Sequence, residues 1–132
     1  MKKNVFLPAI LWALLILILC GLPGKDIPHI SFLELLSFDK LVHAGIFFVL
    51  TVFGIKGCRL QKRSAYMKEH AAFLSAGISS AYGGLMEILQ GTIFIGRTAD
   101  IFDFIADSIG CVAAVWLYPY ISRKIPRLNL PL

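Results

Sequence analysis

The side chains that could do chemistry stand in three short groups far apart in the sequence. The first contains Asp39, Lys40 and His43, and Asp39 and His43 have the i, i+4 spacing that places both on one face of a helix. The other two groups are Glu87 with Gln90, and Asp100, Asp103 and Asp107 at i, i+3 and i+7. Carboxylates beside an imidazole could accept hydrogen bonds from a ligand, act as general acid and base, or hold a metal ion.

The composition indicates what kind of chain positions these groups. Of 132 residues, 58% are hydrophobic and only 16% are charged, against about 25% charged in average soluble domains. The chain is therefore too apolar for an ordinary water-soluble protein, and the same apolar content excludes intrinsic disorder. Its 11 Gly exclude a collagen-like chain and its 3 Cys exclude a disulfide scaffold. The length allows a single domain, residues 1–132.

The apolar residues are gathered into four runs. Residues 4–24 carry no formal charge, and about 20 apolar residues are enough to cross a bilayer. The runs 41–55, 71–86 and 108–122 have only 15 or 16 residues each, so each must take flanking polar residues into its helix to cross. We expect an all-α integral membrane protein, a four-transmembrane-helix bundle with spans over about residues 5–23, 39–57, 70–90 and 99–121.

Lys2 and Lys3 before an apolar run are also typical of a secretory signal peptide. The run is longer than the usual signal segment of about 7 to 15 residues, and no Ala-x-Ala cleavage site follows it. We therefore favour a retained membrane helix. The cysteines Cys20, Cys58 and Cys111 have no metal-type spacing, which favours packing as apolar side chains.

The basic residues indicate the orientation of the helices. Ten Lys and Arg lie at the N-terminus, between the second and third runs, and in the C-terminal tail, whereas three lie in the other two loops. Because short loops rich in Lys and Arg stay in the cytoplasm, we predict that both termini are cytoplasmic (N-in/C-in). The charge of +5 then reflects topology and does not indicate a nucleic-acid partner. In the first outer loop, Ser31 and Glu34 have capping-box spacing, which predicts a short interfacial helix over residues 31–36.

The predicted topology places the three polar groups at the outer ends of their helices. An Asp near the centre of a membrane helix costs about 2.5 to 3.5 kcal/mol, whereas a Leu or Ile returns only about 0.3 to 0.6 kcal/mol. The acids must therefore face the interior of the bundle or a water-filled cavity, and not lipid. On the third run, Ser75, Ser79, Gly83 and Glu87 form one i, i+4 row whose small residues would allow close packing. We expect this third helix to be the central one.

Three segments together resemble the VanZ-like family of small bacterial membrane proteins. They are Asp39-Lys40-Leu41-Val42-His43, Glu87-Ile88-Leu89-Gln90, and the stretch from Gly96 to Gly110 that contains Arg97, Asp103 and Asp107. The resemblance covers residues 39–110 in order. It departs at two positions, since many members have Asn where Asp107 stands and a Tyr is common where Phe47 stands. The family is named for an accessory factor in glycopeptide (teicoplanin) resistance.

The polar groups and the resemblance together predict a multi-pass protein of the bacterial cytoplasmic membrane with an outward-facing polar pocket. The pocket would bind a cell-envelope headgroup or an antibiotic and so affect glycopeptide susceptibility or envelope biogenesis. Its expected partners are membrane lipids and a lipid-linked cell-wall precursor or glycopeptide antibiotic, with Lys40 and Arg97 holding anionic groups. The expected ligand-binding residues are Asp39, Lys40, His43, Glu87, Gln90, Arg97, Asp103 and Asp107.

Three alternatives stay open. In an integral-membrane enzyme acting on a lipid-linked substrate, His43 or Glu87 would be the general base and Arg97 would stabilise negative charge. In a purely structural network, Lys40 and Arg97 would neutralise the acids. A proton-coupled carrier has the required acids, although four spans are few without oligomerisation.

No pair such as His-x-x-x-His is present, so neither a metal nor another cofactor is expected. The oligomeric state is open, because Gly110 and Ala114 could pack within one chain or between two.

Overall fold

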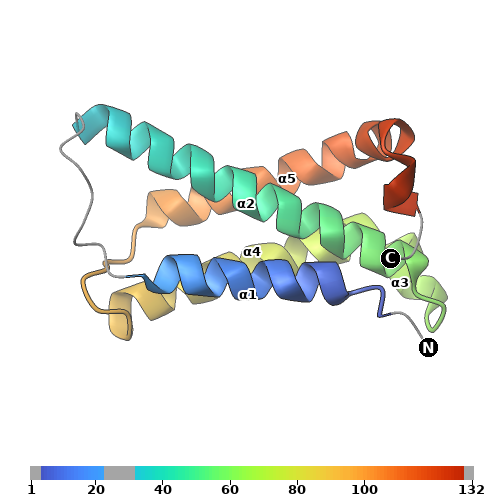
Figure 1. Cartoon of the computed structure of the whole chain (residues 1–132), viewed down its shortest axis with the longest axis horizontal. Helices are drawn as coiled ribbons and strands as arrows, with labels where there is room; N and C mark the ends of the chain where they lie inside the picture. The colour runs from blue at the N-terminus through green and yellow to red at the C-terminus, as the bar shows by residue number, and fades with distance from the viewer. Residues whose placement is uncertain (1–3, 23–31, 130–132) are drawn as a thin grey trace.

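The computed structural model describes residues 4–22 and 32–129, and this part of the chain is helical without strands. Four long helices lie along the long axis of the molecule (Figure 1). They are α1 (Leu7–Gly21), α2 (Phe32–Leu60), α4 (Ala71–Thr92) and α5 (Ile101–Lys124), with the short helix α3 (Ala65–Glu69) after α2 and the 3-10 turn η1 (Pro126–Asn129) at the end. The all-α prediction is therefore confirmed.

Three of the long helices are long and apolar enough to cross a membrane. These segments are Phe38–Leu60, Ala71–Thr92 and Ile101–Lys124, and they overlap the second, third and fourth predicted spans. Helix α1 is more apolar than these three, but its 15 residues extend only about 22 Å, less than the ~30 Å hydrocarbon core. The described residues thus contain three candidate membrane spans and a shorter apolar helix.

The chain reverses direction between successive long helices. The start of α1 and the end of α5 lie at the same end of the bundle as α3, at the right of Figure 1. The end of α4 and the starts of α2 and α5 lie at the opposite end, which we call the polar end. A cytoplasmic location for the α3 end stays a prediction from the basic loop.

Helix α2 is the centre of the bundle, so the expectation that the third apolar helix is central is wrong. Helix α2 packs against α1, α3, α4, α5 and η1, and its contact with α5 is the most extensive. The two helices approach so closely that a Cβ at Gly110 would overlap the backbone carbonyl of Ala44. Gly110 and the fully buried Ala114 therefore pack within one chain. On α4, Ser75, Ser79, Gly83 and Glu87 are buried as one row, as predicted.

The separate short helix predicted over residues 31–36 is also wrong. Residues from Phe32 onward are the first turns of α2, which continues without a break to Leu60. Neither Pro nor Gly occurs between Phe32 and His43 to interrupt the helix. Ser31, the first residue of the predicted capping box, lies outside the described residues.

Two apolar clusters form the core between the helices. One joins α1, α2, α4 and α5 around Ile16, Phe47 and Met86, and the other lies toward the α3 end around Ile55 and Tyr118. All three cysteines are free and buried in these clusters or beside them, which confirms their role as apolar side chains. The outer faces of the helices carry exposed apolar side chains, as membrane helices do.

Candidate functional site

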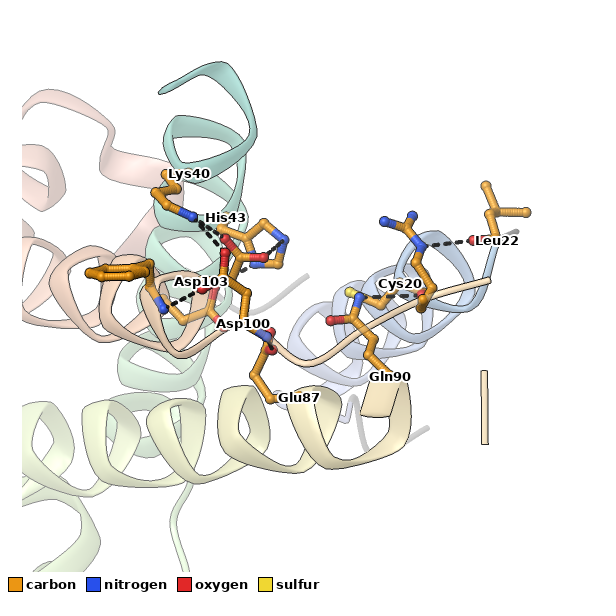
Figure 2. Close-up of polar contacts among 11 residues, drawn as sticks. Cys20, Leu22, Lys40, His43, Glu87, Gln90, Asp100 and Asp103 are labelled. Atoms are coloured by element: carbon orange, nitrogen blue, oxygen red, sulfur yellow. Dashed lines mark hydrogen bonds and ion pairs between the residues drawn. The ribbon is translucent and has the colours of Figure 1, made fainter. Parts of the chain in front are cut away.

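The polar end brings six charged or titratable side chains of three helices into contact. Helix α2 contributes Lys40 and His43, one turn apart, because residues three apart share a helix face. Helix α4 contributes Glu87 from the end of its buried row, and α5 contributes the acids of its first two turns. We call this set the polar cluster (Figure 2): Lys40, His43, Glu87, Asp100, Asp103 and Asp107.

The outer layer of the polar cluster is an ion pair with three members. The Lys40 ammonium donates to Asp100 Oδ2 at 3.1 Å and to Asp103 Oδ1 at 2.8 Å. Asp100 also caps α5, since its Oδ1 accepts the backbone N–H of Phe102 at 2.8 Å. This hydrogen bond, together with the nearby Lys40 charge, lowers the pKa of Asp100. The Lys40 charge is therefore already used within the cluster and joins α2 to the start of α5.

The inner layer is built on the His43 imidazole. Its Nδ1 lies 2.9 Å from Asp107 Oδ1, and its Nε2 lies 3.9 Å from Asp103 Oδ2. His43 is 8% exposed and Asp107 is completely buried. The ring is therefore held between two carboxylates of one helix, and Asp103 links the two layers.

Glu87 connects α4 to the start of α5. Its Oε2 accepts the backbone N–H of Asp100 at 2.7 Å (Figure 2). Its other oxygen, Oε1, and Oδ2 of Asp107 are buried and have no hydrogen-bond partner among the residues that the structure describes. A buried polar atom without a partner typically costs about 1 to 3 kcal/mol. The inner layer thus retains unused acceptor capacity.

Gly83 shapes the inner layer of the polar cluster. The sequence predicts only a role in helix packing for this residue. A Cβ at this position would lie 2.9 Å from Asp107 Oδ2 and 3.3 Å from the Phe47 ring. Any side chain at residue 83 would therefore press on the Asp107 carboxylate. The sequence does contain a hint of this role, because Gly83 stands one helical turn before Glu87 in the buried row.

Two residues of the predicted ligand-binding set lie elsewhere, at the end of α1. Gln90 Nε2 donates to the carbonyl of Cys20 at 3.4 Å, and Arg97 Nε donates to the carbonyl of Leu22 at 3.0 Å. Figure 2 shows Gln90 beside Cys20, apart from the polar cluster. These are carbonyls of the last turn of α1, which have no partner within the helix. Asp39 lies at the rim of the polar cluster, with an oxygen within 4.8 Å of ligand atoms of His43 and Asp103.

The charges of the polar cluster do not balance. Four carboxylates, those of Glu87, Asp100, Asp103 and Asp107, face Lys40 and His43, and His43 is cationic only when protonated. Arg97, which would neutralise acids in the purely structural alternative, donates to a backbone carbonyl instead. The cluster is therefore suited to bind a cation or hydrogen-bond donors.

An open apolar groove of about 450 Å³ runs along α5. It begins at Phe104, the residue after Asp103, and ends at Trp116, which is about 18 Å farther along the helix. No residue of the polar cluster lines the groove. The lining residues are Phe104, Ile105, Ser108, Ile109, Val112, Ala113 and Trp116.

Comparison with known families assigns the chain. The model of the VanZ/LLP1 family matches residues 5–123, so the chain belongs to that family. The match includes the polar cluster and all three candidate spans except the last residue of α5. No curated protein and no solved structure matches the chain.

Proposed function

We propose that this VanZ/LLP1 protein binds an amphipathic molecule of the cell envelope at the outer leaflet, with its headgroup on the polar cluster. Its hydrocarbon part would lie in the groove along α5. Binding of this kind would change the access of a lipid-linked cell-wall precursor or a glycopeptide antibiotic to other envelope components. The protein would then affect glycopeptide susceptibility or envelope biogenesis.

The observation that carries this proposal is the order of the polar cluster and the apolar groove along α5. Asp103 belongs to the cluster, and Phe104, which follows it in the sequence, is the first residue of the groove. A molecule with a polar head and an apolar tail requires these two surfaces in this order, and ligand sites are mostly apolar with a few polar groups that fix orientation.

The charge of the polar cluster narrows the chemistry of the headgroup. Lys40 is paired with Asp100 and Asp103, whereas the carboxylates outnumber the cations. An ammonium group or a set of N–H and O–H donors complements this surface, because hydrogen bonds to charged groups contribute about 1.5 to 3 kcal/mol. We therefore favour a headgroup that donates hydrogen bonds over one that presents only phosphate.

The test measures binding of teicoplanin and of a lipid-linked cell-wall precursor to the purified protein in lipid nanodiscs. Native mass spectrometry of the same preparation identifies any lipid that remains bound. We expect Asp103→Asn to weaken binding by about 10-fold or more, from the loss of a charge-assisted hydrogen bond. Ile109→Trp fills the groove and should also weaken binding.

The matched control for the groove is Ile78→Trp. Ile78 is exposed on α4 and is not part of the groove. An equal loss of binding in both Trp variants would contradict the proposed site. Binding no stronger than to nanodiscs without protein would contradict the function itself.

The environment of His43 favours one second candidate, an integral-membrane enzyme that acts on a lipid-linked substrate. A carboxylate 2.9 Å from Nδ1 is the arrangement that orients a histidine acting as general base. Incubation of the lipid-linked precursor with wild type and with His43→Asn distinguishes the two functions. A product of changed mass formed only by wild type supports the enzyme, and an unaltered bound lipid supports the binding protein.

A further inference from the structure

The inner layer of the polar cluster contains three potential metal ligands from three different helices. His43 of α2, Glu87 of α4 and Asp107 of α5 each present one ligand atom, and these atoms lie within 4.8 Å of one another. The three residues are 8%, 7% and 0% exposed. We propose that they form a site for a divalent transition-metal cation, which would tie the three central helices together.

The state of the two carboxylates supports this site. In each, one oxygen is held by the protein: Glu87 Oε2 by the N–H of Asp100 at 2.7 Å, and Asp107 Oδ1 by His43 at 2.9 Å. The other oxygen of each is buried and has no partner among the described residues. For Glu87, the bond from Asp100 is an outer-shell hydrogen bond of the kind that orients a metal ligand. For Asp107, the bond joins two of the proposed ligands. Bonds from a cation to the two free oxygens would remove the energetic penalty of both.

The distribution of charge points the same way. Lys40 interacts with the outer acids Asp100 and Asp103, so His43 is the one cationic partner left for Glu87 and Asp107 among the described residues. With both carboxylates ionised and the imidazole neutral, the inner layer carries a double negative charge. A divalent cation balances that charge in a region where an uncompensated charge is expensive.

The ligand types indicate which cation fits. One imidazole nitrogen with carboxylate oxygens suits Zn²⁺ and similar divalent transition metals better than Ca²⁺ or Mg²⁺, which prefer all-oxygen sites. Ligand atoms around a four-coordinate Zn²⁺ are about 3.4 Å apart, from bond lengths of about 2.0 to 2.2 Å. The ligand atoms of the three residues lie within 4.8 Å of one another, so each must move by only a short distance to reach that spacing. Gly83 leaves room beside Asp107 Oδ2, and Asp103, 3.9 Å from His43 Nε2, connects the site with Asp39 at the rim.

The experiment uses the full chain in detergent, treated with chelator, dialysed and then titrated with Zn²⁺. Calorimetry gives the dissociation constant, and elemental analysis after gel filtration gives the stoichiometry. We expect wild type to retain one Zn²⁺ per chain. Glu87→Gln and Asp107→Asn each remove a ligand and should weaken binding by about 10- to 100-fold or more.

Glu69→Gln is the matched control for Glu87→Gln. It makes the same chemical change at an exposed carboxylate at the end of α3, outside the polar cluster. We expect it to alter the affinity by less than about threefold, since surface substitutions away from a site change free energies by about 0.5 kcal/mol. Wild type that retains no Zn²⁺, or equal losses in Glu87→Gln and Glu69→Gln, would overturn the proposal.

Absorption by bound Co²⁺ provides a measurement on the wild-type protein, in case the variants fail to fold. Co²⁺ in a site with nitrogen and oxygen ligands gives visible d–d bands, and His43→Cys should add a thiolate charge-transfer band in the near ultraviolet. Absence of both spectra in folded protein also contradicts the site. Metal binding and headgroup binding are measured separately, so either can fail while the other holds.

Discussion

Two groups of polar side chains lie at the same end of the bundle and differ in whether they leave a buried polar atom without a hydrogen-bond partner. At the end of α1, Gln90 and Arg97 each donate to a backbone carbonyl that the helix end leaves free. In the polar cluster, one oxygen of Glu87 and one of Asp107 are buried without a partner among the described residues. The first group holds a helix in place. The second retains binding capacity, and buried unsatisfied groups of this kind are characteristic of functional positions.

This difference predicts opposite responses to substitution. Loss of a residue that only holds a helix should reduce stability in proportion to the bond lost. In the polar cluster, the change in stability should depend on whether a substitution leaves a buried charge without its partner or removes that charge.

The largest effect is expected when the His43–Asp107 pair is broken on one side. His43→Ala leaves the fully buried Asp107 carboxylate without its partner at 2.9 Å, and such a loss typically costs about 3 to 5 kcal/mol. The double replacement of His43 and Asp107 by Leu removes both polar groups together, so it should be more stable than His43→Ala. Unfolding by SDS in mixed micelles measures the difference. A double variant less stable than His43→Ala would contradict the view that the unpaired Asp107 carboxylate causes the loss of stability.

A smaller but substantial effect is expected where α2 and α5 meet beneath the polar cluster. Gly110→Ala places a Cβ against the carbonyl of Ala44 and must push the helices apart, with an expected loss of about 1 to 3 kcal/mol. Gly45→Ala is the control, because a Cβ there has no neighbour within 4 Å. We expect Gly45→Ala to be neutral or to stabilise by up to about 1 kcal/mol. Equal melting temperatures for the two variants would refute the close approach of α2 and α5.

The α1 contacts should respond more weakly. Gln90→Leu removes one hydrogen bond to the Cys20 carbonyl, worth about 0.5 to 1.5 kcal/mol. Because the end of α1 loosens, Cys20, which is 5% exposed, should react faster with a maleimide reagent in native protein. Cys58, which is 4% exposed in the apolar cluster toward the α3 end, serves as the internal control and should keep its low rate. Unchanged labelling of Cys20 would indicate that Gln90 does not hold this helix end.

The smallest effect, and one of opposite sign, is expected for Glu87→Gln in the presence of a chelator. The amide oxygen can still accept the N–H of Asp100, while one buried negative charge is removed. We expect stability to rise by up to about 1 kcal/mol, the net value of one hydrogen bond. A clear loss of stability without metal would mean that the Glu87 charge is itself structural, which would place it with Gln90 and not with a binding site.

Much of the fold could be predicted, because its determinants are local. Uninterrupted apolar runs locate the helices, and the spacing of Asp103, Asp107 and Gly110 correctly places them on one buried face of α5. The identity of the central helix could not be predicted. Small residues on α4 indicate that it packs closely, but not against which helix, and the close approach of Gly110 to Ala44 involves residues distant in the sequence.

The sequence predicted which residues gather at the candidate site better than it predicted which neighbours they contact. Lys40, His43, Glu87, Asp103 and Asp107 do gather at one end of the bundle. Gln90 and Arg97 were grouped with them on sequence position alone, yet both interact with α1. The position of a residue along its helix axis follows from its residue number. The neighbour that it contacts depends on how each helix is rotated in the bundle.

By itself, the sequence determined that the chain forms apolar helices long enough to cross a membrane and that most of its few acids gather at one end. Run length suffices for the first, and the positions of the acids along helices of alternating direction suffice for the second. Only the tertiary structure decided which partners these residues meet: Lys40 pairs with Asp100 and Asp103, Gln90 turns to α1, and oxygens of Glu87 and Asp107 stay unpaired. The physical reason is that contacts between helices depend on their relative rotation and closeness, which here follow from a glycine on α5 meeting the backbone of α2.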